Sequence, residues 1–423
     1  MIPVTRCNYI DAEILPSECL FGRDKELKEL NTKIKNNRWT VVSGKRLVGK
    51  TTLTKTAASE SGRPFIYIDL STVAKQSTAK NIATMDALLI QLIREAKRRN
   101  LIDWDKLKNE TESHWKAQLF LNVLHSNIEY SKTKGADLKS LNLYEVFTAL
   151  KSDTPPIIIL DEIQLLGVEI YALASQLRGA FQQQKPKERP MVILTGSTMS
   201  ITKLFSNPEE YGYEWIFDNE GYHSKPNPWF GRNWPEIFLK PLNHDEHGNE
   251  MAMGLLSKCL EESDKKGCLK SWIMKEVIQQ SLGLPGVIVN FCANVSPGCE
   301  NVEKIIQITR NITRGALLME LRDLGYSAYI LARAKKDFRL SIRELSERLA
   351  KAYRGMAQKG TFSKRNVRTW LNEDKVLTGM VLKVLLDSGV IKEKHGKFIF
   401  AHDAYRDAAR VIRVAFPDFV FSR

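Results

Sequence analysis

The stretch that decides the expected fold is Trp39-Thr-Val-Val-Ser-Gly-Lys-Arg-Leu-Val-Gly-Lys-Thr51. Its first part, Trp39–Ser43, predicts a buried strand, and residues with helical composition and spacing follow the stretch up to Ser59. Between them, Gly44–Thr51 matches the pattern GxxxxGK[ST] in full. Glycines in such a loop let backbone N–H groups surround a phosphate, and the helix N-terminus adds a favourable dipole. The stretch therefore predicts a phosphate-binding loop between a strand and a helix.

Individual residues of this loop have distinct expected functions. Lys50 is expected to reach the β- and γ-phosphates of a nucleotide, and Thr51 is expected to ligate magnesium. The residues expected to surround the bound nucleotide are Gly44, Lys45, Val48, Gly49, Lys50, Thr51 and Thr52. A glycine-rich turn that binds no nucleotide is the alternative, and the strand–loop–helix context disfavours it.

A second motif, Ile157-Ile-Ile-Leu-Asp161-Glu162, directly follows Pro155-Pro156. Its apolar run predicts a buried strand that delivers Asp161 to the coordination shell of magnesium. Glu162, one residue further on, is placed to polarise the attacking water as a general base. On its own the motif suits a strand that ends at a solvated acidic turn equally well. Downstream of a phosphate-binding loop, it predicts hydrolysis of the nucleotide and not binding alone.

Two more short apolar stretches, Phe65–Leu70 and Met191–Thr195, predict strands that alternate with helices. This alternation predicts an α/β fold whose parallel sheet is covered on both faces. The second stretch ends in Thr195-Gly-Ser197-Thr198, whose hydroxyls are candidates for contacting the γ-phosphate or the attacking water. A simple turn is the alternative at that position. The chain contains no guanine-reading NKxD motif, which favours ATP over GTP.

At 423 residues the chain is long enough for several domains, and three are predicted. Residues 1–242 form a P-loop ATPase domain with a helical insertion at about 75–153. Residues 243–322 form a helical lid, and residues 323–423 form a C-terminal winged helix with three short helices and a hairpin that turns at His395-Gly396. The segment Ser206–Pro235 is predicted to be an irregular loop bearing Trp215, Trp229 and Trp234.

The net charge of +14 favours polyanionic partners. Basic residues strongly outnumber acidic ones between Arg333 and Lys375, within the predicted winged helix. Lys364, Arg365 and Arg368 are therefore candidates for contacting the phosphates of double-stranded DNA, and a solvated basic face is the alternative.

The chain shows no signal peptide and no apolar run long enough to cross a membrane, so we expect a cytoplasmic protein without a membrane partner. Its six cysteines include no CxxC pair, and we expect free, mostly buried thiols.

Several of these stretches resemble the STAND ATPases, and among them the archaeal-type ATPases related to AAA+ and origin-recognition proteins. Phe21-Gly22-Arg23-Asp-Lys-Glu26-Leu27 is similar to the FGRxxEL motif, which lines the adenine pocket in that family. Gly283-Leu284-Pro285 resembles the GxP motif of the lid, whose proline packs on the adenine. Val192-Ile-Leu-Thr-Gly-Ser197 resembles the sensor strand, so the resemblance assigns Ser197 to the nucleotide site.

Two further similarities imply residues that sense the state of the nucleotide. Phe230-Gly231-Arg232 with Ile237–Leu242 is similar to a later family element, which makes Arg232 a candidate for sensing phosphate in cis or across a subunit interface. Phe400-Ala-His402-Asp403 resembles a histidine–aspartate motif, and in some members that histidine faces the phosphates of ADP. An ordinary polar residue after a wing strand is an equal alternative for His402.

The sequence favours an ATP- and Mg²⁺-dependent switch of the STAND type that acts on DNA through a basic winged helix. One alternative is a signalling or defence ATPase whose winged helix is an intramolecular lid and whose protein partner docks on the insertion at about 75–153. Another is a mobile-element ATPase that selects DNA target sites, with nucleotide-dependent homo-oligomers on the DNA.

Overall fold

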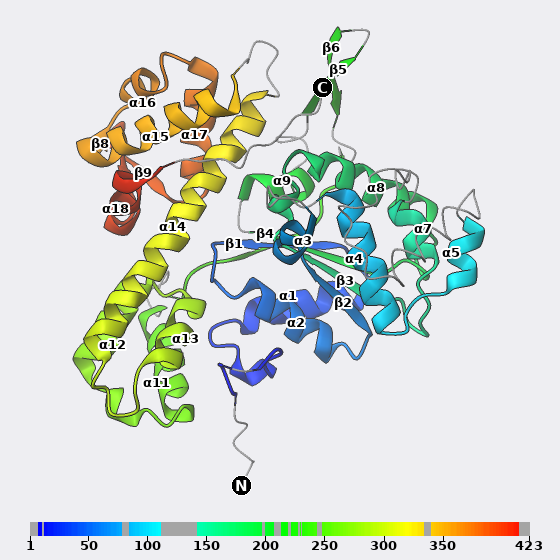
Figure 1. Ribbon diagram of the computed structural model, residues 1–423, viewed down its shortest axis with the longest axis horizontal. Coiled ribbons are helices and arrows are strands. Elements are labelled where there is room, and N and C mark those ends of the chain that lie inside the picture. Colours follow the sequence, from blue (N-terminus) through cyan, green and yellow to red (C-terminus); the bar gives the residue numbers. More distant parts are fainter. Residues whose placement is uncertain are drawn as a thin grey trace.

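The structure is a computed structural model, which describes residues 7–10, 12–77, 84–110, 142–196, 199–206, 213–218, 221–226, 229, 231–242, 248–333 and 340–413. A five-stranded parallel sheet forms the centre of its N-terminal part (Figure 1). The strands, in spatial order, are β2 (Phe65–Asp69), β3 (Ile157–Asp161), β4 (Met191–Gly196), β1 (Thr40–Gly44) and β7 (Glu236–Leu239). The four strands predicted from the sequence are confirmed, and β7 is added beside β1.

Helices cover both faces of this sheet, which confirms the predicted α/β class. Figure 1 shows α8 (Ile170–Gln183) and α9 (Met199–Ser206) on one side, and α1 (Asp24–Lys35) and α2 (Lys50–Glu60) on the other. Strands β1, β3 and β4 are buried throughout, as the apolar composition of a doubly covered parallel sheet requires. Shorter elements complete this part: the 3-10 turns Ser17–Cys19 and Ile163–Glu169 and the helix α3 (Leu70–Ser77).

The segment predicted as a helical insertion contributes helices that pack into the core of the sheet domain. They are α4 (Met85–Arg98), α5 (Trp104–Glu110) and α7 (Leu143–Thr148). The amphipathic pattern of Met85–Arg99 is confirmed, since α4 buries Leu88, Leu92 and Ile93 completely. A second predicted helix, Trp115–Glu129, lies outside the described residues.

The expectation of an irregular loop over Ser206–Pro235 is wrong for the part of the segment that forms strands. Residues Tyr213–Asp218 (β5) and Gly221–Pro226 (β6) form an antiparallel hairpin. Trp229 and Trp234 are 2% and 4% exposed, and they pack with Trp39 in a cluster of aromatic rings. The loop composition concealed this because turn-forming residues surround side chains that belong to the core.

Helices dominate the rest of the chain. Those of the first group are α11 (Gly248–Glu262), α12 (Ser271–Ser281) and α13 (Pro285–Asn294), with a 3-10 turn at Lys266–Cys268. The final group contains α15 (Ile342–Lys359), β8 (Thr361–Phe362), α16 (Lys364–Trp370), α17 (Lys375–Asp387), β9 (Ile391–Lys394), β10 (Lys397–Phe400) and α18 (Asp403–Val411). Each group has its own hydrophobic core.

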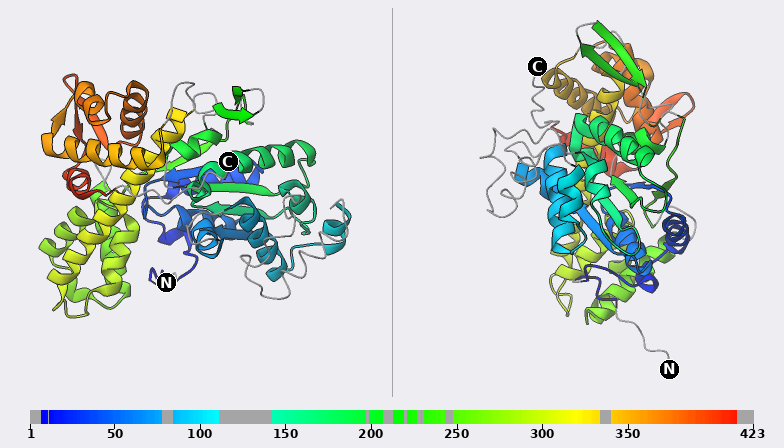
Figure 2. Two further views of the ribbon diagram at one scale, coloured as in Figure 1. Left: turned by 45° about the horizontal axis from the view of Figure 1, so that its top comes forward. Right: turned by 90° about the vertical axis from the view of Figure 1, so that its right-hand side faces the viewer.

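One long helix, α14 (Val302–Arg333), connects the two groups, and Figure 1 and the left view of Figure 2 show it beside the sheet domain. It runs without a break across residues 322 and 323, where the sequence analysis divides two domains. The predicted hairpin turn is confirmed: His395 and Gly396 adopt φ values of 51° and 68° between β9 and β10. No helix in the described ranges is long and apolar enough to cross a bilayer.

The cysteines differ from the expectation of free thiols. Cys7 pairs with Cys19 and Cys268 with Cys299, at Cα separations of 5.6 and 5.5 Å. Cys259 and Cys292 are free and buried, as expected. The pairings follow from tertiary contacts within the helical group and the N-terminal segment, which spacing along the chain does not reveal.

We expect Trp229→Ala to lower the free energy of unfolding by ~3–5 kcal/mol, because it removes a buried ring and leaves a cavity. The indole also loses its hydrogen bond to the carbonyl of Ala174, at 3.0 Å. Urea unfolding followed by circular dichroism measures the change. Trp272→Ala is the matched control, since Trp272 is 52% exposed and its loss should alter stability by less than ~0.5 kcal/mol. Equal losses in both variants would contradict the burial of Trp229.

Candidate active site

The loop between β1 and α2 has the geometry that its glycines predict. Gly44 and Gly49 adopt φ values of 150° and 96°, and a Cβ at Gly44 would lie 2.6 Å from the carbonyl oxygen of Leu239. Lys50, the first residue of α2, is 4% exposed, and its Nζ donates to the carbonyls of Gly44 and Lys45 at 3.1 and 2.9 Å. Burial lowers the pKa of Lys50, while the carboxylates of Glu162 and Asp161 oppose this shift.

Asp161 is the last residue of β3, and both oxygens of its carboxylate accept hydrogen bonds. Oδ2 accepts from Thr51 Oγ1 at 2.5 Å and from the Tyr67 hydroxyl at 2.9 Å. Oδ1 accepts from the Thr195 hydroxyl and, at 2.9 Å, from the backbone N–H of Glu162. The sheet order explains why Thr51, Thr195 and Asp161 lie close together. Strand β4, which carries Thr195, lies between β3 and β1, the strand that precedes the loop.

Glu162 follows in the left-handed region, with φ at 59°. This backbone turns its carboxylate toward the loop, where Oε2 accepts from the amide of Gln164 and lies 3.6 Å from the guanidinium of Arg46. Burial raises the pKa of Glu162, and the charges of Lys50 and Arg46 oppose that shift. A carboxylate with a raised pKa beside a phosphate-binding loop is suited to accept a proton from water.

A cavity of about 340 Å³ adjoins the loop, which is a volume typical of small-molecule sites. Its walls come from three parts of the chain: the N-terminal segment, the loop, and the helices α11 and α13. Of the residues predicted to bind nucleotide, its lining includes Phe21, Arg23, Val48, Gly49, Lys50, Thr51, Thr52 and Pro285. Glu162 also lines it. The structure thus brings the predicted phosphate and adenine residues to one cavity.

Two sets of contacts fix the loop to its surroundings. Arg23 is 7% exposed, and its Nη2 donates to the carbonyls of Val48 and Lys240 at 3.1 and 2.7 Å. Gly22 precedes it with φ at 62°, which lets the chain turn between Phe21 and α1. On the other side, the N–H of Gly286 donates to the carbonyl of Leu47 at 2.9 Å, so α13 begins directly on the loop.

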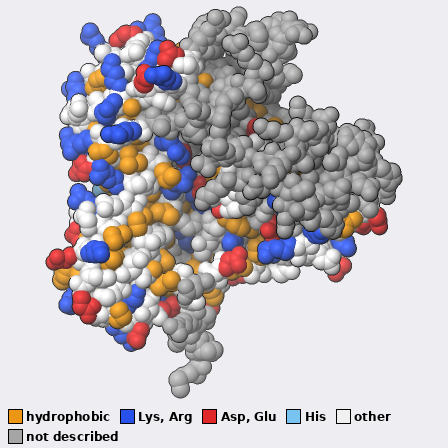
Figure 3. Space-filling view, viewed as in Figure 1, with side chains coloured by type: hydrophobic (Ala, Val, Ile, Leu, Met, Phe, Trp, Pro, Cys, Tyr) orange, Lys and Arg blue, Asp and Glu red, His pale blue; other side chains and the backbone are white. Residues whose placement is uncertain are grey.

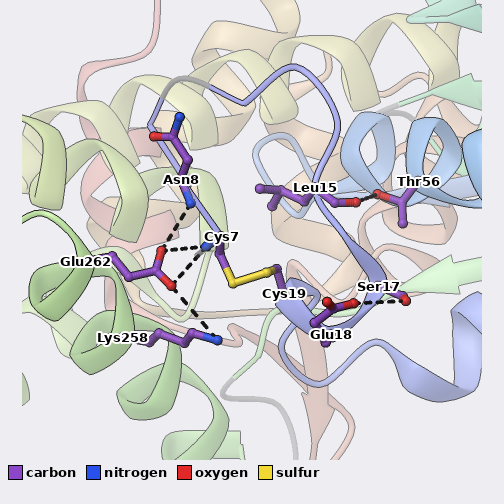
Figure 4. The surroundings of a disulfide bond; sticks show 9 residues. All are labelled: Cys7, Asn8, Leu15, Ser17, Glu18, Cys19, Thr56, Lys258 and Glu262. Atoms are coloured by element: carbon purple, nitrogen blue, oxygen red, sulfur yellow. Dashed lines mark hydrogen bonds and ion pairs between the residues drawn. A yellow bond between two sulfur atoms is a disulfide. The ribbon is translucent and has the colours of Figure 1, made fainter. Parts of the chain in front are cut away.

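The N-terminal wall is closed by the disulfide between Cys7 and Cys19 (Figure 4). Backbone N–H groups of Cys7 and Asn8 donate to Glu262 on α11, at 3.0 and 3.1 Å. The carbonyl of Leu15 accepts from Thr56 on α2 at 2.8 Å. This segment therefore joins the helix of the phosphate loop to the first helix of the following group.

Other predicted residues lie elsewhere. Ser197 lies outside the described residues. His402 is exposed and caps α18, accepting from the N–H of Ala404 at 3.1 Å, and it lines a separate cavity of about 620 Å³ between α12, α14 and α18. Arg232 is exposed and bonded through its N–H to Trp229, whose ring packs on Trp39 at the start of β1. Arg232 thus precedes the start of β7, at the opposite end of the parallel strands from the phosphate loop, which follows the end of β1.

The three candidates for DNA contact share one short helix, α16. Lys364 and Arg365 are exposed, while Arg368 pairs with Glu373 at 3.0 Å. Figure 1 places α16 at the upper left of the molecule. In the same view, Figure 3 shows Lys and Arg side chains over this part of the surface, interspersed with Asp and Glu.

Sequence reasoning missed residues that approach the loop from the C-terminal part of the chain. Arg46 Nη2 lies 3.4 Å from Asp323 on α14 as well as 3.6 Å from Glu162. Lys45 Nζ lies 4.6 Å above the ring of Tyr405 on α18, whose hydroxyl donates to the buried Glu320 at 2.9 Å. The sequence of α14 contains no motif that marks Glu320 or Asp323 as residues near the loop. Only the tertiary structure reveals these contacts.

Comparison with known proteins agrees with this geometry. Residues 40–207 match the family described as "ATPase family associated with various cellular activities (AAA)". No curated protein matches the chain. Among solved structures, the Walker-type ATPase PABY2304 of Pyrococcus abyssi superposes with a TM-score of 0.58 at 20% identity, covering 95% of this chain and 99% of that one.

The Thermotoga maritima RuvB Holliday junction branch migration motor is also similar, with a TM-score of 0.40 and 11% identity over 95% of this chain and 98% of its own. The first of these likenesses supports the fold, and the family match covers the phosphate loop and the end of β3 with Asp161 and Glu162. Over residues 40–207, which include the phosphate loop and Asp161 with Glu162, this chain is therefore similar to the ATPase domains of the AAA family.

Proposed function

We propose that the chain is an ATP-hydrolysing conformational switch of the STAND type, in which helices α11–α13 form the lid and α15–α18 form a winged helix. The observation that carries the proposal is the position of Arg46. This residue of the phosphate loop contacts the candidate base Glu162 and, at the same time, Asp323 of the helix that leads into the C-terminal group. Nucleotide chemistry and the position of that group therefore depend on the same guanidinium.

Magnesium fits the donor set at the end of β3. Thr51 donates its proton to Asp161, which leaves oxygen lone pairs of the hydroxyl for a metal, and Asp161 is placed to hold a metal-bound water. Bound magnesium would neutralise charge on the β- and γ-phosphate oxygens. Lys50 supplies a second cation from the first turn of α2.

Glu162 is the residue that we assign as general base. Gln164 and Arg46 fix its carboxylate, and the left-handed backbone holds it on the cavity wall. It accepts the proton of the attacking water as the γ-phosphoryl group leaves. The hydroxyls of Thr195 and Tyr67 donate hydrogen bonds to Asp161.

The switch rests on competition between acidic side chains and phosphate for the same cations. Asp323 and Glu320 lie one helical turn apart on α14 and face Arg46 and Lys45. Burial raises the pKa of Glu320, and Lys45 opposes that shift. A γ-phosphate adds negative charge beside both cations, so it weakens their attachment to α14. Hydrolysis removes that charge and favours the docked arrangement.

The winged helix is placed in this arrangement as an intramolecular partner. Its third helix, α17, packs along α14 and buries Leu377, Val381 and Leu385. In three-helix variants of the helix-turn-helix the third helix enters the major groove, and here one face of that helix packs on α14. This packing favours the alternative in which the winged helix is an intramolecular lid. It disfavours direct binding of DNA by α17.

DNA binding through α16 is a second candidate function, because Lys364 and Arg365 remain exposed on it. The similarity to a Holliday junction motor carries no weight for this choice. A protein partner on α4, α5 and α7 has less support, since α4 packs into the core of the sheet domain.

We expect Glu162→Gln to bind ATP normally and to lower the rate of hydrolysis by about 10²–10⁴-fold, as removal of a general base does. Lys50→Ala should abolish binding or turnover. Phosphate release and fluorescent-nucleotide titration measure both. Glu188→Gln, at an exposed acid just before β4 and therefore at the opposite end of the strands from the loop, should behave like the parent. Parent-like turnover of Glu162→Gln would exclude it as the base.

We expect Asp323→Asn to speed the release of a fluorescent ADP analogue by about ten- to a hundredfold, because a hydrogen bond to a charged group contributes ~1.5–3 kcal/mol and ~1.4 kcal/mol is a factor of ten. Stopped-flow fluorescence measures the rate. Glu303→Gln removes an exposed acid from the first turn of the same helix and should leave the rate unchanged. An unchanged or slower rate in Asp323→Asn would contradict the proposed attachment of α14.

If α16 binds DNA, affinity for a labelled duplex should fall steeply as salt rises, and the double variant Lys364→Ala, Arg365→Ala should reduce the slope of log K against log salt by about 2. Fluorescence anisotropy measures the affinity. Lys266→Ala with Lys275→Ala removes the same charge from the helical group before α14 and is the control. Absence of binding at low salt, or a flat slope, rules out this second candidate.

A further inference from the structure

The carboxylate of Asp161 receives one hydrogen bond that no nucleotide-binding motif supplies. Thr51, Thr195 and the backbone of Glu162 belong to the loop and strand ends that the sequence motifs mark. The hydroxyl of Tyr67, at 2.9 Å from Oδ2, belongs to the neighbouring strand β2.

The sheet places Tyr67 for this contact. Strands β2 and β3 are parallel, with Tyr67 opposite Ile159 and Asp69 opposite Asp161. Side chains alternate along a strand, so Tyr67 and Asp161 project from the same face. That face is the one covered by α2, because Lys55 of α2 lies 4.0 Å above the ring of Tyr67.

The ring is held between the sheet and a cation. Tyr67 packs against the hydrophobic core, and the ammonium of Lys55 is fixed in turn by Glu13 at 3.3 Å. A cation over the face of an aromatic ring is attracted by its electron density. The phenolic hydroxyl of Tyr67 is the donor in this contact, because an ionised carboxylate can only accept hydrogen bonds.

We propose that Tyr67 is a positioning residue for the divalent cation of the nucleotide site. It fixes the rotamer of Asp161, so that Oδ2 remains beside Thr51 and the metal-bound water has a preformed acceptor. The inference rests on the proposed function, since it concerns the metal that accompanies ATP. Partners in the second coordination shell orient metal-binding groups, and their loss commonly weakens metal affinity by about 10–100-fold.

The direct test is Tyr67→Phe in the full chain, which keeps the ring and removes only the hydroxyl. Manganese is the probe, because electron paramagnetic resonance of the free ion reports its binding to the protein–ADP complex without any turnover. We expect the manganese dissociation constant to rise about tenfold. Metal-free affinity for a fluorescent ADP analogue should stay within about twofold of the parent value, and it also reports that the variant is folded. Tyr144→Phe is the matched control, since Tyr144 on α7 lines a separate cavity near the residues at which β3 and β4 begin, at the opposite end of the strands from Asp161.

The outcomes separate this inference from the proposed function. If the parent chain binds no manganese with ADP, the proposed function fails and the inference fails with it. If the parent binds manganese and Tyr67→Phe binds it equally well, Tyr67 has no positioning function while the proposed function stands. Equal losses of metal-free ADP affinity and manganese affinity would also overturn the inference, because they would indicate a general disturbance of the cavity. Steady-state turnover of Tyr67→Phe should recover to within about twofold of the parent at saturating Mg²⁺.

Discussion

The ion pairs of Arg46 are the interaction on which the rest of the structure depends. One guanidinium, part of the phosphate loop, lies between Glu162 of the sheet domain and Asp323 of α14. Burial lowers the pKa of this guanidinium, but the two carboxylates together raise it, so it remains a cation. A cation shared by the candidate base and the connecting helix links the chemistry of the cavity to the position of the C-terminal group.

The other elements hold this arrangement in place. Arg23 and Gly286 fix the loop from two sides, and the disulfide between Cys7 and Cys19 closes the N-terminal wall against α11. The hydrophobic core of α15–α18 continues onto α14, so this group and that helix share one packed core. Tyr405 adds a second contact, since its hydroxyl binds Glu320 while its ring lies under Lys45.

Local patterns predicted the parts of the site that are local in the chain. The phosphate loop and the strand ending in Asp161 could be found because glycine spacing and an apolar run encode them directly. Family resemblance identified Arg232 and His402 by motif, but their surroundings depend on packing, and the structure places both outside the cavity. Tyr67, Glu320 and Asp323 act through contacts between distant segments, for which single-sequence patterns carry no signal. The disulfide pairing and the burial of Trp229 depend on the same long-range packing.

The most direct test of the account is hydrogen–deuterium exchange of the full-length Glu162→Gln variant, compared with ATP and with ADP. If phosphate competes with α14 for Lys45 and Arg46, amides around Glu320 and Asp323 and those of α18 will exchange faster with ATP than with ADP. Amides of β1, β3 and β4 should exchange at the same rate with both nucleotides, since the sheet core does not change. Equal exchange of α14 and α18 with both nucleotides, under conditions where both are bound, would contradict the proposed switch.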